Sequence, residues 1–230
     1  MEQNFIYLVD LNDYLVCINL KNTSSITSVL AVHLLTYKNE FHPIYYCDLE
    51  QLLVNEKAVQ LGFSSPRFNY ITLANWYNNG TQIGIGSKNE IIHFYSRTEK
   101  EKILKTARLE IEFEKVRRIV NPLFPSRLTC IFLAEDNLEG RTMLKNMFYK
   151  RKSNFLIEKI KIEYAFLFHK VHYRWIEIYE EDNREEYIYS YWLGKPFDKY
   201  PQFEYLLEGQ ISIKNEEALA LIKKKIAEFQ

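Results

Sequence analysis

Glycine and proline are scarce in this chain, with seven and six copies among 230 residues, and no internal repeat or low-complexity tract occurs. The hydrophobic fraction of 47% is enough for a packed core, which excludes disorder as the general state. Tyrosine and phenylalanine are abundant, and because aromatic residues favour strands, we expect a mixture of helix and sheet. The length suits one substantial domain, or a domain with an appended lobe.

Cysteine is equally scarce. The three cysteines, Cys17, Cys47 and Cys130, are odd in number, widely spaced and flanked by apolar residues. This pattern argues against a disulfide framework or a zinc knuckle, and it predicts reduced, buried thiols in a cytosolic protein.

Net charge is absent too, because 30 basic side chains balance 30 acidic ones. A large, uniformly basic face is therefore not indicated, and neither is strong non-specific binding to nucleic acid. Lys145, Lys150, Arg151 and Lys152 leave a local basic patch open, with the solvated end of a helix as the alternative.

Two further absences concern membranes. The N-terminus lacks the basic region of a signal peptide, and no apolar run approaches the roughly 18 residues that a spanning helix needs. We therefore expect a cytoplasmic protein without a membrane partner.

Hydrophobic periodicity predicts the α+β class, since the predicted strands do not strictly alternate with helices. A polar, aromatic stretch at 64–89 with the turn dipeptide Asn79-Gly80 predicts a loop-rich region, and segment 25–37 suits either a helix or a strand. The predicted strands or extended segments are 5–9, 14–20, 43–47, 128–134, 159–168, 173–179 and 203–213. The predicted helices are 49–61, 98–120, one after Asp136 or Asn137, 183–194, and one that Asn215 caps.

The stretch NPLFPSRLTCIFLAED, residues 121–136, places two prolines, Ser126 and Arg127 directly before a predicted strand. The prolines fix the bend, the serine offers a hydroxyl at the mouth of the strand, and Arg127 can bind an anion or brace the loop. The alternative is a structural serine–proline turn in which Arg127 forms a salt bridge.

Four segments, taken in order, resemble a family of uncharacterised bacterial proteins in the ADP-ribosyltransferase superfamily. Together they cover about residues 110–213, so that a single domain 1–230 would combine a divergent half, 1–97, with a half that carries the resemblance, 98–230. The four segments are FEKVRR (113–118), FPSRLTCIFLAED (124–136), YSYWLG (189–194) and FEYLLEGQISI (203–213).

The resemblance implies an NAD-binding fold of two small antiparallel or mixed sheets around a cleft, with flanking helices. In the superfamily a His or Arg on the first strand holds the adenosine half of NAD, and a Ser, Thr or Tyr on a middle strand supports the nicotinamide half. A Glu on a late strand holds the nicotinamide ribose. Breaking the nicotinamide–ribose bond develops positive charge on the sugar, so a fixed carboxylate there acts most strongly in the transition state.

Glu204 is the catalytic candidate that the resemblance implies, with Glu208 as a competitor and an exposed charge on an edge strand as the alternative. Arginine can bind a pyrophosphate and aromatic rings can stack on nicotinamide. Tyr191 and Trp192 suit that aromatic role, although core packing explains them too. The candidates for NAD binding are Tyr7, Ser126, Arg127, Tyr191 and Trp192.

The first strand departs from the family pattern. The expected histidine is absent from FIYLVD, where Tyr7 or Leu8 occupies the comparable place. The segment HFYSR offers His93 and Arg97 as another equivalent, but it directly precedes a predicted helix.

The leading hypothesis is an NAD-dependent mono-ADP-ribosyltransferase, or an NAD glycohydrolase, with an unknown protein or nucleic-acid acceptor. Family analogy suggests a toxin or an antiphage defence effector, which would act with an antitoxin or a regulatory partner. The alternative is a catalytically inactive relative that binds a protein or a nucleotide. A metal-dependent hydrolase is disfavoured because His169 and His172, three apart in a strand, point to opposite faces.

Overall fold

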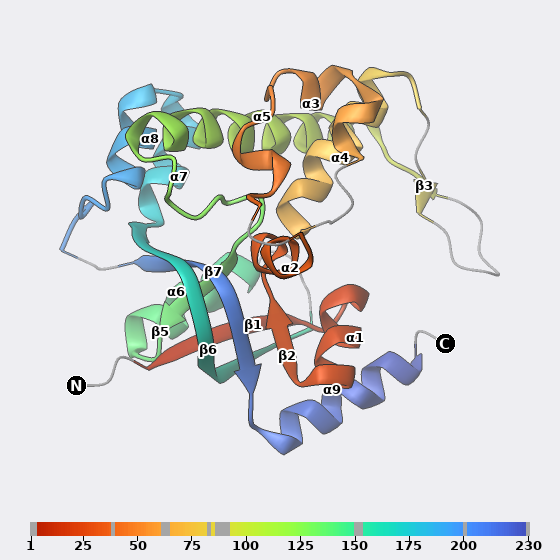
Figure 1. The fold of residues 1–230 in the computed structure, drawn as a ribbon, viewed down its shortest axis with the longest axis vertical. Coiled ribbons are helices and arrows are strands. Elements are labelled where there is room, and N and C mark those ends of the chain that lie inside the picture. Colours follow the sequence, from red (N-terminus) through yellow and green to blue (C-terminus); the bar gives the residue numbers. More distant parts are fainter. Residues whose placement is uncertain are drawn as a thin grey trace.

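Antiparallel strand pairing organises the molecule, whose computed structural model describes residues 4–37, 40–60, 65–81, 84–85, 93–149, 154–199 and 202–228. Five strands form one sheet in the order β2–β7–β5–β1–β6 (Figure 1). β6 also pairs with β7, so that β7, β5, β1 and β6 form a closed circuit. The strands are β1 (Phe5–Asp10), β2 (Ser25–Thr27), β5 (Ile131–Glu135), β6 (Phe155–His172) and β7 (Phe203–Ile213), and β3 (Gly84–Ile85) and β4 (His93–Phe94) form a separate pair.

Helices cover this sheet on several sides. In Figure 1 the long α5 crosses above the strands together with α3, α4, α7 and α8, while α1 lies beside β2 and α9 lies below. The described helices are α1 (Tyr14–Thr23), α2 (Val29–Thr36), α3 (Gln51–Val54), α4 (Pro66–Asn78), α5 (Arg97–Val120), α6 (Leu138–Tyr149), α7 (Arg174–Asp182), α8 (Glu185–Trp192) and α9 (Glu216–Glu228), with the 3-10 turns η1 (Pro43–Tyr45) and η2 (Glu56–Val59).

Side-chain alternation along β1 distributes its apolar residues between two packing layers. Phe5 and Val9 pack in the cluster that also contains residues of α1 and α9. Ile6 and Leu8 pack instead against α6. Both faces of β1 are therefore covered, which explains why FIYLVD is apolar almost throughout.

The central strand β7 is buried over nearly its whole length. Glu204 pairs with Ala134 of β5 on one side and with Val171 of β6 on the other. The alternative reading of Glu204 as an exposed charge on an edge strand is therefore wrong, and its carboxylate requires polar partners inside the protein.

The α+β class is confirmed, and so are several predicted elements. The capping box of Ser96 and Glu99 begins α5, whose 24 residues match the predicted helix 98–120 and leave no strand there. Gly194, with a φ of 62°, follows α8 as predicted. Strand 203–213 is confirmed as β7, and the irregularity expected near Gly209 lies on β6, opposite that glycine.

Other predicted elements are wrong. Residues 14–20 form α1 rather than a strand, because Asp13 accepts a hydrogen bond from the Val16 N–H and starts a helix. Residues 43–47 begin with the 3-10 turn η1 instead of extended chain. Segment 173–179 lies mostly in α7, and the partners of β6 are β1 and β7.

The stretch 64–89, predicted to be loop-rich, contains the helix α4. The Ser65 side chain caps this helix and Pro66 stands at its first turn, while Gly80 has the positive φ expected at the Asn-Gly turn. The two small sheets implied by the resemblance also differ from what is described: one sheet has five strands, and the other has only the two short strands β3 and β4.

Candidate functional site

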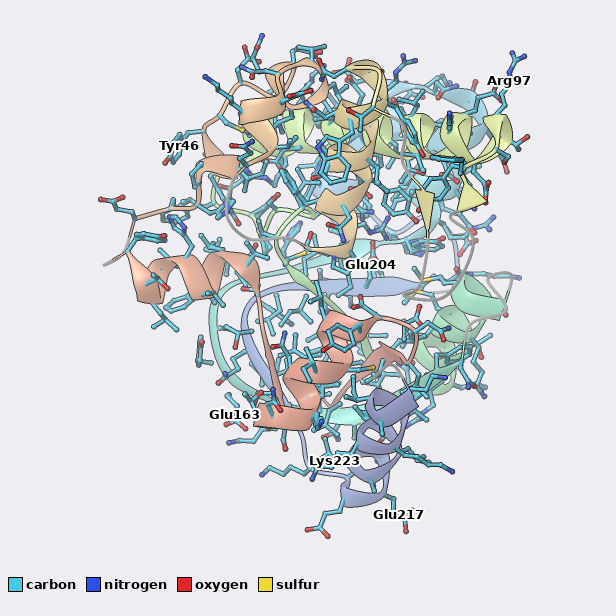
Figure 2. The ribbon with its side chains drawn as sticks, turned by 90° about the vertical axis from the view of Figure 1, so that its right-hand side faces the viewer. Tyr46, Arg97, Glu163, Glu204, Glu217 and Lys223 are labelled. Atoms are coloured by element: carbon cyan, nitrogen blue, oxygen red, sulfur yellow. The ribbon has the colours of Figure 1, made fainter. Side chains whose placement is uncertain are left out.

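Four buried glutamates converge on the turn that precedes β5. Glu110 and Glu114 lie one helical turn apart on α5, and Glu204 and Glu208 lie four residues apart on β7. Figure 2 shows Glu204 in the interior between the helices and the lower sheet, in contrast to the peripheral Arg97 and Glu217. Segment 126–129 contacts all four carboxylates, so the bend before the strand is the centre of a buried polar network.

Arg127 joins α5 to β7. Its Nε and Nη2 donate to the two carboxylate oxygens of Glu110 at 2.9 and 3.0 Å, and its Nη1 lies 3.1 Å from Glu204 Oε1. The Tyr191 hydroxyl donates to the same Oε1 at 2.9 Å. Burial alone would lower the pKa of Arg127, but Glu110, Tyr191 and Glu204 outweigh it and raise that pKa well above its usual value.

The proline-containing bend is held by a second arginine. Arg117 donates to both oxygens of Glu114 and to the carbonyls of Pro122 and Phe124. The Ser126 hydroxyl donates to Glu114 at 2.8 Å. Ser126 and the bend are thus anchored to α5 by charge-assisted hydrogen bonds, which are stronger than neutral ones.

Glu208 differs from the other three glutamates because no arginine forms an ion pair with it among the described residues. The hydroxyls of Thr129 and Tyr45 donate to its Oε1, and the Ser28 hydroxyl lies nearby. Its Oε2 is buried without a hydrogen-bond partner in the described part of the chain. Burial, opposed by these three hydroxyls, raises the pKa of Glu208 to about 7.

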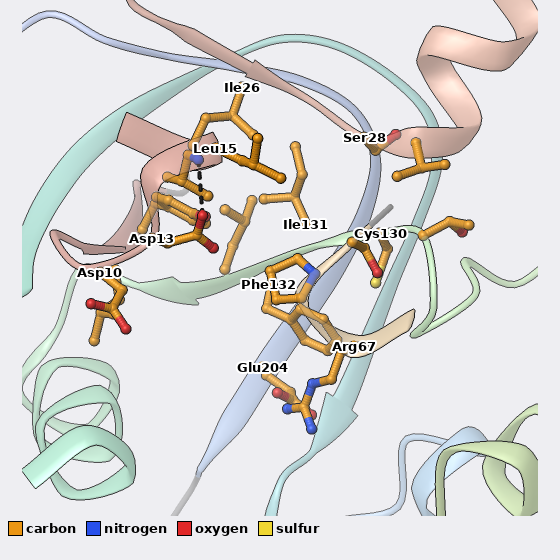
Figure 3. Close-up of a pocket in the computed structure, with 18 of the residues that line it drawn as sticks. Asp10, Asp13, Leu15, Ile26, Ser28, Arg67, Cys130, Ile131, Phe132 and Glu204 are labelled. Atoms are coloured by element: carbon orange, nitrogen blue, oxygen red, sulfur yellow. Dashed lines mark hydrogen bonds between the residues drawn. The ribbon is translucent and has the colours of Figure 1, made fainter. Parts of the chain in front are cut away.

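A cavity of about 290 Å³ lies beside this network. Much of its wall is apolar, contributed by β1, α1, β5 and α6, and Glu204 and Tyr7 both line it. Figure 3 shows Arg67 and Glu204 together below Phe132, with Asp10 and Asp13 away from them on the other side of the view. Burial, and then the nearby Asp13, Cys17 and Asp10, raise the pKa of the Tyr7 hydroxyl, which favours its neutral form.

Arg67, which is not among the predicted site residues, links the cavity to the network. Its Nη1 donates to Glu110 at 2.8 Å, and its guanidinium carbon lies 5.1 Å from the centre of the Phe132 ring. Arg67 and Arg127 together outweigh the effect of burial and lower the pKa of Glu110. The Ser65-Pro66 pair at the start of α4 is the sequence signal that could have located this residue.

The predicted site residues divide into two groups. Glu204 and Tyr7 line the cavity, as a catalytic and a binding candidate should. The other four, Ser126, Arg127, Tyr191 and Trp192, are all buried behind it. Trp192 donates its indole N–H to the Phe113 carbonyl, and its ring packs in the core beneath α5, α7 and α8.

The remaining candidates lie elsewhere. His169 stacks on Phe124, and its Nε2 lies 2.8 Å from the Trp192 carbonyl oxygen. Across the described ranges, no three His, Cys, Asp or Glu residues are grouped as metal ligands would be. Lys150, Arg151 and Lys152 of the basic segment lie outside the described residues, and so does the side chain of His93.

The helices that the structure describes include none that is long and apolar enough to cross a bilayer. The three cysteines are free thiols, and Cys17 and Cys130 are buried as predicted, whereas Cys47 is only partly buried.

The sequence matches the profile of one protein family over residues 32–223, most of the chain. That family is described as "Protein of unknown function (DUF2441)". A search of curated proteins finds no match.

Proposed function

We propose that this chain, which belongs to the DUF2441 family, binds NAD in this cavity and transfers ADP-ribose, with Glu204 on the nicotinamide ribose, as the resemblance of residues 110–213 implies. The observation that carries this proposal is the placement of Glu204. Glu204 is only 2% exposed and lines the cavity from β7, which pairs with β5 on one side and β6 on the other.

The chemistry follows from how this carboxylate is held. Both hydrogen bonds described at Glu204 go to Oε1, from Arg127 and Tyr191, so the carboxylate is held in one orientation. When the nicotinamide–ribose bond breaks, the sugar becomes positively charged. A preorganised carboxylate beside it then stabilises the transition state more than the ground state.

The dimensions and lining of the cavity suit part of a dinucleotide. Its volume is close to the lower end of the roughly 300–1,000 Å³ that small-molecule pockets span, so it would accept the nicotinamide and its ribose rather than all of NAD. Tyr7 and Phe132 supply aromatic wall, and Ile131 and Leu133 apolar wall, for a planar ring.

The proposal changes the role of two residues. Arg127 and Tyr191 do not line the cavity, and their polar groups are engaged by Glu110 and Glu204. They therefore act as positioning residues that fix the Glu204 carboxylate, not as contacts to the pyrophosphate or to nicotinamide. Ser126 has a similar indirect role, because its hydroxyl binds Glu114.

The second candidate is an inactive relative that binds a nucleotide in this cavity. The observation that favours it is Tyr7, which lines the cavity from the strand where the resemblance implies a histidine. With a neutral phenol in that place, a ligand could be held without the contact that orients NAD for cleavage.

An etheno-NAD fluorescence assay separates the two candidates. We expect wild type to cleave the nicotinamide bond, Glu204→Gln to be slower by about 100-fold or more, and the surface control Glu217→Gln to match wild type. Calorimetry with NAD on the same three proteins adds the second readout. NAD binding without cleavage by any of them supports the inactive relative. A lack of both binding and cleavage contradicts the enzyme and excludes NAD as the nucleotide of the inactive relative.

A further inference from the structure

We infer that Arg67 forms an anion-binding end of the cavity, so that the ligand carries a phosphate or pyrophosphate group there. This inference rests on the proposed function for the identity of the ligand as NAD, but the requirement for an anion comes from the cavity. Arg67 is partly open, with 24% of its side chain exposed, while its partner Glu110 is fully buried.

The network holds Arg67 in place through one described hydrogen bond, which leaves most of its N–H donors uncommitted. Glu110 already receives two hydrogen bonds from Arg127, so Arg67 binds it with Nη1 alone. The hydrogen bond described at Arg67 uses Nη1 alone, and a guanidinium carries five N–H donors. The face of Phe132 and the Glu110 oxygen together orient the planar group at the cavity wall.

Guanidinium groups with spare donors recognise phosphate oxygens through paired hydrogen bonds. The charges around the cavity give the ligand a direction. Asp10 and Asp13 line the cavity away from Arg67, and their carboxylates would repel an anion placed beside them (Figure 3). Among the described residues that line the cavity, Arg67 is the one cation, so an anionic group is favoured beside its guanidinium. The Glu204 carboxylate at the same end is already paired with Arg127.

The positions of Arg67 and Glu204 also agree with the covalent structure of NAD. Arg67 and Glu204 line the same end of the cavity, and Arg127 connects them through Glu110. In NAD the pyrophosphate is attached to the 5′ carbon of the ribose that Glu204 would contact. A ribose at Glu204 thus brings the adjoining phosphate toward Arg67.

Calorimetry at low salt tests the inference with four probes: inorganic pyrophosphate, ADP-ribose, NAD, and nicotinamide riboside, which lacks phosphate. We expect Arg67→Gln to weaken pyrophosphate and ADP-ribose binding by about tenfold or more, and to leave nicotinamide riboside within about twofold. Arg67→Lys keeps the positive charge but loses the paired N–H donors of the guanidinium. Its affinity for pyrophosphate should therefore lie between those of wild type and Arg67→Gln. The matched control is Arg97→Gln, which removes an arginine that is 91% exposed at the start of α5.

The outcomes separate this inference from the proposed function. Wild-type affinity of Arg67→Gln for pyrophosphate and ADP-ribose overturns the inference, even if NAD is cleaved. Arg67-dependent binding of pyrophosphate by a protein that does not cleave NAD supports the inference and overturns the function. Should Arg67→Gln fail to fold, Arg67→Lys provides the test: weaker pyrophosphate binding with unchanged nicotinamide riboside binding supports the inference, and wild-type affinity for pyrophosphate contradicts it.

Discussion

The Arg127 guanidinium lies between Glu204 and Glu110, with its Nη1 3.1 Å from Glu204 Oε1 and its Nε 2.9 Å from Glu110 Oε2. One side chain from the bend before β5 thereby connects the central strand β7 with the long helix α5. The bend is rigid because its arginine and its serine are both bound to buried carboxylates.

Arg127→Met is expected to destabilise the protein strongly. It leaves Glu204 and Glu110 buried with one fewer cation, and breaking such a buried pair costs about 3–5 kcal/mol of unfolding free energy. Urea unfolding measures the loss. The surface pair Arg174–Glu177, with both side chains 37% exposed, provides the control, because Arg174→Met should cost no more than about 1 kcal/mol. A similar small loss for both variants would contradict the role of Arg127.

Glu208 predicts a pH dependence of stability. Its pKa is about 7 in the folded protein and 4.5 in a free side chain, so the folded state binds the proton more tightly. This contribution is fully present below pH 4.5 and is lost as the pH rises through 7.

Glu208→Gln has no titratable group at this position, so its unfolding free energy should not show this dependence on pH. Relative to wild type it should gain on the order of 2–3 kcal/mol in unfolding free energy between pH 4 and pH 8. Chemical unfolding at both pH values measures the difference. Parallel profiles for the two proteins would show that Glu208 does not titrate in this range.

Gly209→Ala is expected to be destabilising because β6 approaches β7 too closely there. A Cβ on Gly209 would overlap the Tyr164 carbonyl, which is backbone and cannot rotate away. We expect a loss of at least about 2 kcal/mol, measured by thermal or urea unfolding. Gly80 is the contrast, since nothing lies within 4 Å of its added Cβ and only its φ of 79° opposes alanine. If Gly80→Ala lost more unfolding free energy than Gly209→Ala, the inferred close approach of β6 to β7 would be wrong.

Tyr191→Phe tests the positioning of Glu204 with little change in shape. It removes the hydroxyl that donates to Glu204 Oε1 at 2.9 Å but keeps the ring in the core. If the proposed activity holds, kcat should fall by about tenfold while the KM for NAD changes little, because the hydroxyl does not line the cavity. A raised KM at unchanged kcat would mean that Tyr191 contacts the ligand.

The sequence predicted elements whose periodicity or caps are strong. Helix α5 was located correctly because its apolar residues recur at helical spacing on one side, and strand β7 because it is a long, largely apolar run. Helices α1 and α7 were mistaken for strands because their aromatic and β-branched residues favour either state, and tertiary packing decided. Helix α4 was missed because its polar and aromatic residues mask the capping signal of Ser65.

The candidate site was also predicted only in part, because the sequence located some of its strands but not the contacts between distant elements. Glu204 and Tyr7 stand on strands that the sequence located, and both line the cavity. Arg67 and Glu110 are far apart in the sequence and meet only through the packing of α4 against α5, so no local sequence pattern predicts their contact. The burial of Arg127 likewise depends on Glu110, 17 residues away on another element.

The account depends most on the contact between Glu204 and a ribose, and a crystal structure with a non-hydrolysable NAD analogue tests it most directly. The expected result places a hydroxyl of the nicotinamide ribose about 2.6–3.2 Å from a Glu204 oxygen, inside the cavity that Tyr7 lines. A dinucleotide bound elsewhere on the protein, or one whose riboses both lie beyond hydrogen-bond reach of Glu204, would contradict it.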